Sequence, residues 1–327
     1  MAQVKDKVEN ALNETRILVL GIQILIGFDF KSFFEPGFSR MAPYTQEIQV
    51  AALGLMLVGF GVLMLPVSFH RIVLHGRNTA GFHRLGTLTV SAGLFPFALA
   101  MSLSFFLGAR WVLGTAGAAI VGGSVLLATL LGWYVLELAA RRRKHGRIHL
   151  YAIFDPLREI QMSEEQETDL TTRVKQVLIE CRVVLPGAQA LLGFQLIIMW
   201  MTEFYKIPQS WKLLHLASLL SVAVSTILLI LPAAYHRIVE QGEDSEMLHH
   251  ITARALLAAM VFLALGICGD FYVVCRMTGI GTILSTALSA CLLAFFYGAW
   301  FGYTYWKKRA IRNPRLTASH LEEHRAA

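Results

Sequence analysis

A histidine–arginine pair follows a proline and an aromatic residue at two places in the chain, and these residue types suit proton chemistry. Residues 62–73 read VLMLPVSFHRIV and residues 228–239 read LLILPAAYHRIV. Histidine changes charge near neutral pH, and a proline within a helix removes a backbone hydrogen bond and can kink it. Two interpretations stay open: a gate at a kinked helix, or an anchor that ends the helix among lipid headgroups. The residues concerned are Pro66, His70, Arg71, Pro232, His236 and Arg237.

Two glutamates are expected at the same level of the structure as these pairs. Glu14 and Glu180 each precede an apolar run. Because that level is the end of the helix that carries each pair, the two glutamates can form ion pairs with Arg71 and Arg237.

Four histidines are expected near short loops between apolar runs. His70 can approach His83, and His236 can approach His249, across such a loop. Two histidines on facing helices can ligate a haem or a metal. All four would lie at the membrane edge, whereas buried haem ligands usually sit deeper, so we expect no cofactor and no metal.

A polar stripe marks the first apolar run of each half. Arg16, Gln23 and Gly27 are spaced i, i+7 and i+11, which places them on one helix face. An amide inside a membrane helix is costly unless it faces protein or water, and a glycine lets a neighbouring helix approach closely. The stripe either lines a path between the halves or makes hydrogen bonds at a tight contact; in both cases the amides should face protein. The second copy is Arg182, Gln189 and Gly193.

Three acidic residues, Asp29, Glu137 and Asp270, lie within or near apolar runs. At 1.5 Å per residue, Asp29 is roughly 18 Å along the first helix. The equivalent residues of the other half are not acidic, so the acids break the internal symmetry, as an ion or proton pathway would. The alternative is that acids near a membrane edge meet water or cap a helix. The equivalent residues are Gln195, Tyr303 and Ser104.

The elements that position these side chains are eight apolar runs in a chain that repeats itself. One register, offset by 166 residues without a gap, relates the halves over about 130 residues, which indicates a tandem duplication. Of the 327 residues, 55% are hydrophobic and 16% are charged, against about 25% charged in ordinary globular chains. A spanning helix needs about 20 apolar residues. We therefore predict an all-α membrane protein with eight transmembrane helices in two parallel four-helix units, at 17–34, 48–70, 85–107, 112–138, 183–200, 213–236, 251–274 and 279–305.

The distribution of Lys and Arg predicts the orientation. With the N-terminus in the cytoplasm, only six of the 29 basic residues fall in outer loops, which leaves 23 on the inner side. Both termini are therefore expected in the cytoplasm, facing anionic lipid headgroups. The predicted divisions are a tail at 1–16, a first repeat at 17–143, a cytoplasmic linker at 144–179, a second repeat at 180–309 and a tail at 310–327.

Several functional classes are disfavoured by the sequence. The basic run RRRKHGR at 141–147 directly follows an apolar helix, so topology and lipid contact explain it and we expect no nucleic-acid partner. The four cysteines have no CxxC spacing and are expected to be buried apolar residues. The chain has no phosphate loop, HExxH motif or nucleophile elbow, and almost no soluble mass, so we do not expect an enzyme.

The segments ETRILVLGIQILIGFDF and ECRVVLPGAQALLGFQ, each followed by the Pro…His-Arg phrase, resemble a bacterial four-helix membrane family of unknown function. Its members commonly carry one copy, and some are labelled sodium:proton antiporters. The resemblance implies two fused copies and a bacterial inner-membrane location. It brings no catalytic or binding residue with it.

The favoured function is transport or conduction of a small ion, a proton or a monovalent cation. A scaffold or accessory subunit that binds partner helices or lipids is the alternative, with a haem- or metal-binding redox subunit third. A homo-oligomer is compatible with either of the first two roles.

The charge distribution can be tested by labelling from outside the cell. In a variant without the four native cysteines, a cysteine at position 39, in place of Ser39, should react with an impermeant maleimide, because it is expected outside. A cysteine at position 163, in place of Ser163, should react only after the membrane is opened. The reverse pattern would show that the predicted orientation is wrong.

Overall fold

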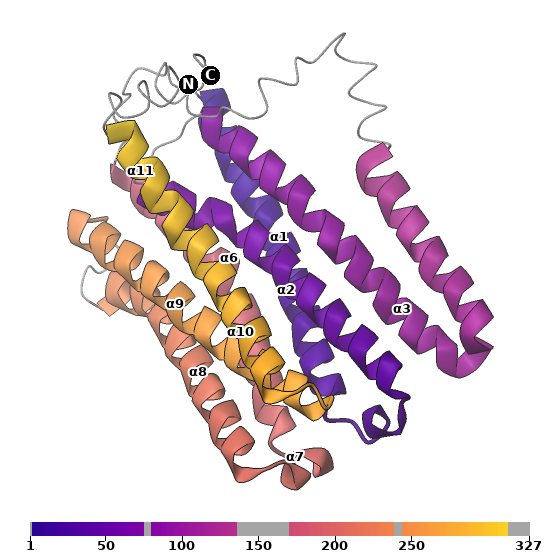
Figure 1. Ribbon diagram of the computed structural model, residues 1–327. Coiled ribbons are helices and arrows are strands. Elements are labelled where there is room, and N and C mark those ends of the chain that lie inside the picture. Colours follow the sequence, from indigo (N-terminus) through magenta and orange to yellow (C-terminus); the bar gives the residue numbers. More distant parts are fainter. Residues whose placement is uncertain (1, 75–79, 136–169, 239–243, 313–327) are drawn as a thin grey trace, which may run out of the picture.

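The computed structural model describes residues 2–74, 80–135, 170–238 and 244–312, and every long element in these ranges is a helix (Figure 1). Within this part of the chain no strand occurs. The first half contains α1 (Ala2–Ser32), η1 (Phe38–Arg40), α2 (Pro43–Ile72), α3 (Ala80–Leu130) and η2 (Leu131–Val135). The second half contains α6 (Leu170–Ile198), α7 (Thr202–Lys206), α8 (Gln209–Ile238), α9 (Glu246–Met277), α10 (Thr282–Tyr297), η4 (Gly298–Tyr303) and α11 (Thr304–Arg312).

Seven helical segments are long and apolar enough to cross a membrane, counted over the described residues. Two of them lie on either side of a kink in α3. The first leg is Leu85–Arg110, and the second leg is Val112–Val135, which continues through η2. Gly114, at the kink, adopts a φ of 70°. A residue with a side chain rarely adopts this φ, so a glycine suits the turn. Helix α1 is not among the seven, and the count of eight spans stays a prediction. The chain is built as a membrane protein of long apolar helices.

Two helices begin before the predicted membrane spans. Helix α6 already begins at Leu170, so the last ten residues of the predicted linker 144–179 belong to the second bundle. Helix α1 begins at Ala2, and the predicted tail 1–16 is therefore helical. Polar residues precede the apolar run in both cases, and hydropathy alone does not mark where such a helix starts. The rest of the linker up to 169 and the tail from 313 lie outside the described residues.

The two halves share local features at the same offset. Pro66 and Pro232 both lie inside their helices, α2 and α8, which continue past them. Both halves also contain a short π-helix, Leu131–Val135 and Gly298–Tyr303, and these overlap when the register is shifted by 166 residues. A π-helix in the same place of both halves agrees with duplication of one folding unit.

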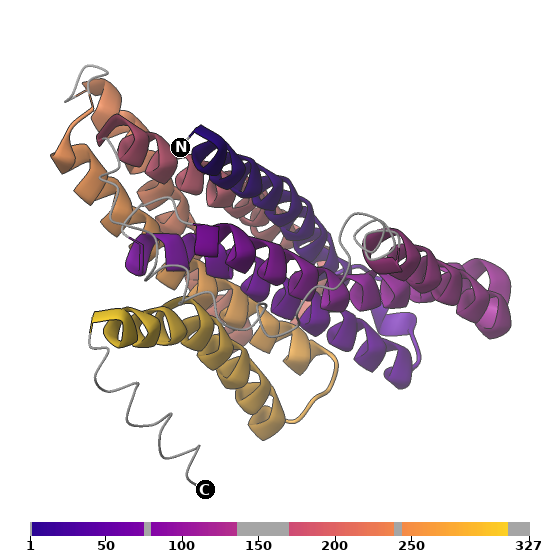
Figure 2. The same cartoon turned by 90° about the horizontal axis from the view of Figure 1, so that it is seen from above.

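Helices α1 and α6 lie side by side and join the two halves (Figures 1 and 2). Close packing there depends on glycine: a Cβ added to Gly27 would lie 2.0 Å from the ring of Phe194, and one added to Gly187 would lie 1.5 Å from Oε1 of Gln23. The rings of Phe28 and Phe194 are 4.5 Å apart. The first helix of each half thus contacts the other half directly.

The last helix of the second half also crosses to the first half. Trp300 donates a hydrogen bond from Nε1 to the carbonyl oxygen of Gly61 on α2 at 2.8 Å. Its indole stacks on Phe296 and meets Phe60 edge to face. The equivalent helix of the first half, the second leg of α3, lies at the edge of the molecule in Figure 1 and is largely exposed. The two halves are therefore alike in sequence but packed differently.

The asymmetry of this packing can be tested with equivalent glycines. Gly27→Leu should lower the free energy of unfolding by about 1–3 kcal/mol, because added bulk in a packed interface forces backbones apart. Gly193→Leu is the matched control, since nothing lies within 4 Å of a Cβ built there. The measurement is thermal unfolding of both variants in detergent. Equal losses of stability would show that α1 and α6 do not pack as described.

Candidate functional site: buried polar clusters on helix α6

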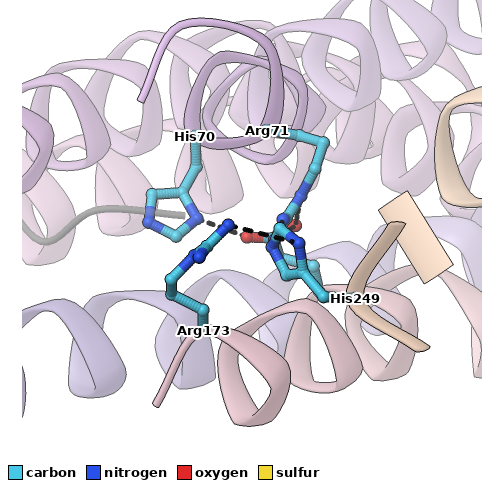
Figure 3. A network of polar contacts seen from close by, with 5 residues as sticks. His70, Arg71, Arg173 and His249 are labelled. Carbon is cyan, nitrogen blue, oxygen red and sulfur yellow. Dashed lines mark hydrogen bonds and ion pairs between the residues drawn. The ribbon is translucent and has the colours of Figure 1, made fainter. Parts of the chain in front are cut away.

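The carboxylate of Glu180 is fully buried at the junction of the two halves and is surrounded by basic side chains of α2. Arg71 donates to Oε2 from Nε at 3.0 Å and from Nη2 at 2.8 Å. Nδ1 of His70 contacts Oε1. His70 and Arg71 are buried as well, and Figure 3 shows both side chains converging on the same carboxylate. One acid of the second half thus holds the histidine–arginine pair of the first.

A second histidine, His249 of α9, completes this group of side chains (Figure 3). We call the group the inner cluster, because it lies at the end of the helices that is expected to face the cytoplasm. Nη1 of Arg71 lies 3.0 Å from Nε2 of His249, and Nη2 of Arg173 lies 3.5 Å from its Nδ1. A neutral imidazole accepts at only one nitrogen and donates from the other. The shorter contact assigns the acceptor to Nε2, so Nδ1 carries the proton. Arg173 itself is paired with Glu246 at 3.0 Å.

The inner cluster keeps one unused polar atom. Within the described part of the chain, Nε2 of His70 is buried without a hydrogen-bond partner, and the centre of the Phe82 ring lies 4.6 Å from that of the imidazole. A buried ion pair adds little stability over apolar residues of similar volume, whereas removing one partner costs about 3–5 kcal/mol. Ionisable groups inside membrane segments therefore mark functional sites by default. The cluster has such groups in a hydrogen-bonded chain.

An outer cluster lies at the other end of α6. Asp270 accepts from Nε2 of Gln195 at 2.6 Å and from Nδ1 of His215 at 2.9 Å. Nε2 of His215 lies 3.1 Å from the carbonyl oxygen of Gln195. All three side chains are buried, and Phe34 and Phe204 pack around the imidazole. This is a second buried acid–histidine pair, built from α6, α8 and α9.

The side chain of Gln23 lies between the two clusters. It is buried against Gly187 of α6, and neither its Oε1 nor its Nε2 has a hydrogen-bond partner among the described residues. Gly187 follows Glu180 by seven residues and precedes Gln195 by eight, which corresponds to about 10 and 12 Å along the helix. A buried amide without partners costs free energy. Helix α6 therefore carries or contacts buried polar side chains at three heights, near Glu180, Gly187 and Gln195.

Asp29 is half-buried, and its Oδ2 is buried without a partner. With the 166-residue offset, Asp29 corresponds to Gln195. The first-half equivalents of His215 and Asp270 are Gln49 and Ser104. Each half therefore has one acid among these three equivalent positions. The acid is Asp29 on α1 in the first half and Asp270 on α9 in the second. The equivalent set in the first half does not form the same bonds: Gln49 donates to Ser32, and Ser104 donates to Ala100.

The predicted stripe lies at a helix contact in the first half but not in the second. Gln23 and Gly27 are buried between α1 and α6, but Gln189 is exposed and no atom approaches a Cβ placed on Gly193. The expectation that both amides face protein is wrong, because the contact pairs this face of α1 with a different face of α6. Arg16 is half-buried and Arg182 is exposed.

Of the two glutamates and two arginines that could form ion pairs, Glu180 pairs with Arg71, and this pair joins the two halves. The side chains of Glu14, His83 and Arg237, like residue Glu137, lie outside the described residues. His249 contacts Arg71 and Arg173 in place of the expected His236, which lies 3.8 Å from Asp244. Among the described side chains, no group of three or more His, Cys, Asp or Glu is placed to hold a metal ion.

Gln195 and His215 were not singled out from the sequence. A signal was present: the first-half equivalents of these residues and of Asp270 are Asp29, Gln49 and Ser104. Every one of these six positions is polar within an apolar run. Polar residues at equivalent positions of three helices indicate a shared cluster. Arg173 fell inside the predicted linker and was missed because the start of α6 was placed too late.

Comparison with known proteins identifies the family. Residues 2–137 and residues 163–304 each match DUF6328, a family of unknown function. The chain belongs to this family. It contains two copies of the family unit, as the resemblance implied. No curated protein and no solved structure matches the chain.

The ion pair at the centre of the inner cluster can be tested by a double-mutant cycle. Glu180→Gln should lower stability by about 3–5 kcal/mol, because it leaves the Arg71 guanidinium buried and unpaired. Glu180→Gln combined with Arg71→Met should be less harmful than Glu180→Gln alone. Thermal unfolding in detergent measures both, with the exposed Glu47→Gln as control. A Glu180→Gln variant as stable as this control would exclude a buried pair.

Proposed function

We propose that this protein conducts protons across the membrane along the interface of α1 and α6. The observation that carries the proposal is the unpartnered amide of Gln23, buried between two clusters of buried ionisable side chains. Proton relays in membrane proteins are chains of Asp, Glu and His that face the bundle interior. Glu180 with His70, and Asp270 with His215, are such groups.

The chemistry of the three levels favours a proton over a metal cation. Each end has an acid hydrogen-bonded to an imidazole, which can take up a proton on one nitrogen and release one from the other. The acids are already bound by Arg71, His70, His215 and Gln195, so few oxygen atoms remain to coordinate a metal ion. Gln23 offers a donor and an acceptor to a chain of water molecules, which would bridge the distance to the cluster on either side.

In this function the inner and outer clusters are exchange sites, and Gln23 orients water between them. A proton taken up at His215 and Asp270 would pass beside Gln23 to Nε2 of His70, the buried nitrogen without a partner. Nδ1 of His70 contacts Oε1 of Glu180, so a proton that arrives at Nε2 would leave from Nδ1 through this carboxylate, whose other oxygen is bound by Arg71. The pathway needs no large movement of helices.

A flux assay with repeat-matched variants tests the proposal. Purified protein is reconstituted in liposomes with a trapped pH-sensitive dye, and a potassium diffusion potential drives protons inward. Wild type should acidify the lumen faster than empty liposomes. Gln23→Leu should slow this by about tenfold or more, which corresponds to a barrier higher by about 1.4 kcal/mol. Gln189→Leu should conduct like wild type, because Gln189 is exposed although it is the equivalent residue.

Two outcomes would contradict proton conduction along this interface. Wild-type traces that equal those of empty liposomes would favour the alternative of a scaffold, with the Glu180 cluster as a structural link between the halves. Equal effects of Gln23→Leu and Gln189→Leu would place any conduction elsewhere in the protein. Detergent melting curves of both variants distinguish loss of conduction from loss of fold.

A further inference from the structure

A cavity of about 210 Å³ opens at the end of the first half that lies opposite the start of α1. It lies where η1, the first turn of α2 and the end of the first leg of α3 meet. This place is far along the helices from the Glu180 cluster, so the cavity is separate from the inner site. The residues that line it are Arg40, Met41, Ala42, Thr45, Leu107 and Arg110.

The lining combines two positive charges with no negative one. Arg110 donates from Nη1 to Oγ1 of Thr45 at 2.6 Å and from Nη2 to the hydroxyl of Tyr44, and its guanidinium lies 4.7 Å from the centre of the Tyr44 ring. A guanidinium has five N–H donors, so further donors remain for a ligand. Arg40 is exposed at the rim. Helix α2 also begins here, and the N-terminal end of a helix favours an anion.

The equivalent place in the second half holds a tryptophan side chain beside its arginine. Arg276 is equivalent to Arg110, and Trp211 is equivalent to Thr45. The guanidinium of Arg276 lies 5.2 Å from the centre of the Trp211 ring and donates to the carbonyl oxygen of Ile280 at 2.6 Å. The aromatic partner thus sits one position later than Tyr44 does in the first half. Where the second half has an indole, the first half has a threonine beside an open cavity.

We propose that this cavity binds the phosphate group of an anionic phospholipid. Arginine recognises phosphate by paired charge-assisted hydrogen bonds, and the two arginines supply the charge. Met41, Ala42 and Leu107 give the same cavity an apolar wall, which suits the glycerol and first acyl carbons of a lipid. Free inorganic phosphate offers the same anionic group without the apolar part. Comparing the two ligands therefore identifies the source of the phosphate.

Binding is measured on the full-length protein in detergent after removal of endogenous lipid. Native mass spectrometry counts the molecules of phosphatidylglycerol that remain bound, and a titration gives the affinity. Thr45→Trp should weaken the tightest binding by about tenfold or more, equivalent to about 1.4 kcal/mol, because it introduces the side chain that occupies this place in the second half. Arg40→Gln should weaken it similarly. Lys206→Gln is the matched control, since Lys206 is equivalent to Arg40 in the second half.

Each result has a definite consequence. Loss of phosphatidylglycerol binding in Thr45→Trp and Arg40→Gln, but not in Lys206→Gln, supports the site. If inorganic phosphate binds in the same titration as tightly as phosphatidylglycerol, the result supports an anion site but overturns the lipid as its ligand. Unchanged lipid binding in Arg40→Gln overturns the proposal even if Thr45→Trp does not fold, because Arg40 is exposed and its change leaves the packing intact.

Discussion

The pairing of Glu180 with Arg71 is the interaction on which the arrangement of the two halves depends. The carboxylate is on α6 and the guanidinium on α2, and both are buried. In a membrane segment neither charge can be left alone, because an unpaired buried charge costs several kcal/mol. The pair therefore fixes the register of α6 against the first half. Gly187 and Gln195 lie further along the same helix, so the ion pair also sets where Gly187 meets Gln23 and where Gln195 meets Asp270.

Duplication supplied two similar bundles, but their assembly made equivalent residues different. Gln23 is buried while Gln189 is exposed, and Gly61 accepts the Trp300 indole while its equivalent Ile227 is exposed. The acid of the equivalent set lies on α1 in the first half, at Asp29, and on α9 in the second half, at Asp270. A histidine at position 215 could then be paired only in the second half.

The helices and the repeat were predictable because apolar runs of about 20 residues and a constant offset are properties of the sequence alone. Glu180 and Arg71 could be expected at the same level of the structure, but the sequence did not show that the partner of Glu180 would come from the other half. The exposure of Gln189 was not, because helical periodicity says which residues share a face but not which face meets a neighbour. The outer cluster needed three helices to be placed together. Hydropathy also could not find the start of α6, whose first turns are polar.

The spacing along α6 limits what can move through the molecule. The side chain of Gln23 is buried between the levels of Glu180 and Gln195, and it abuts Gly187 closely enough that a Cβ there would collide with it. A hydrated cation is far larger than the space such contact leaves, whereas a proton needs only a line of hydrogen bonds. Conduction of a metal ion would require α1 and α6 to separate and would break the contact between Gly27 and Phe194. The proton conduction that we propose requires only that water reach an amide already in place, so the tight glycine packing and the proposed route share one interface.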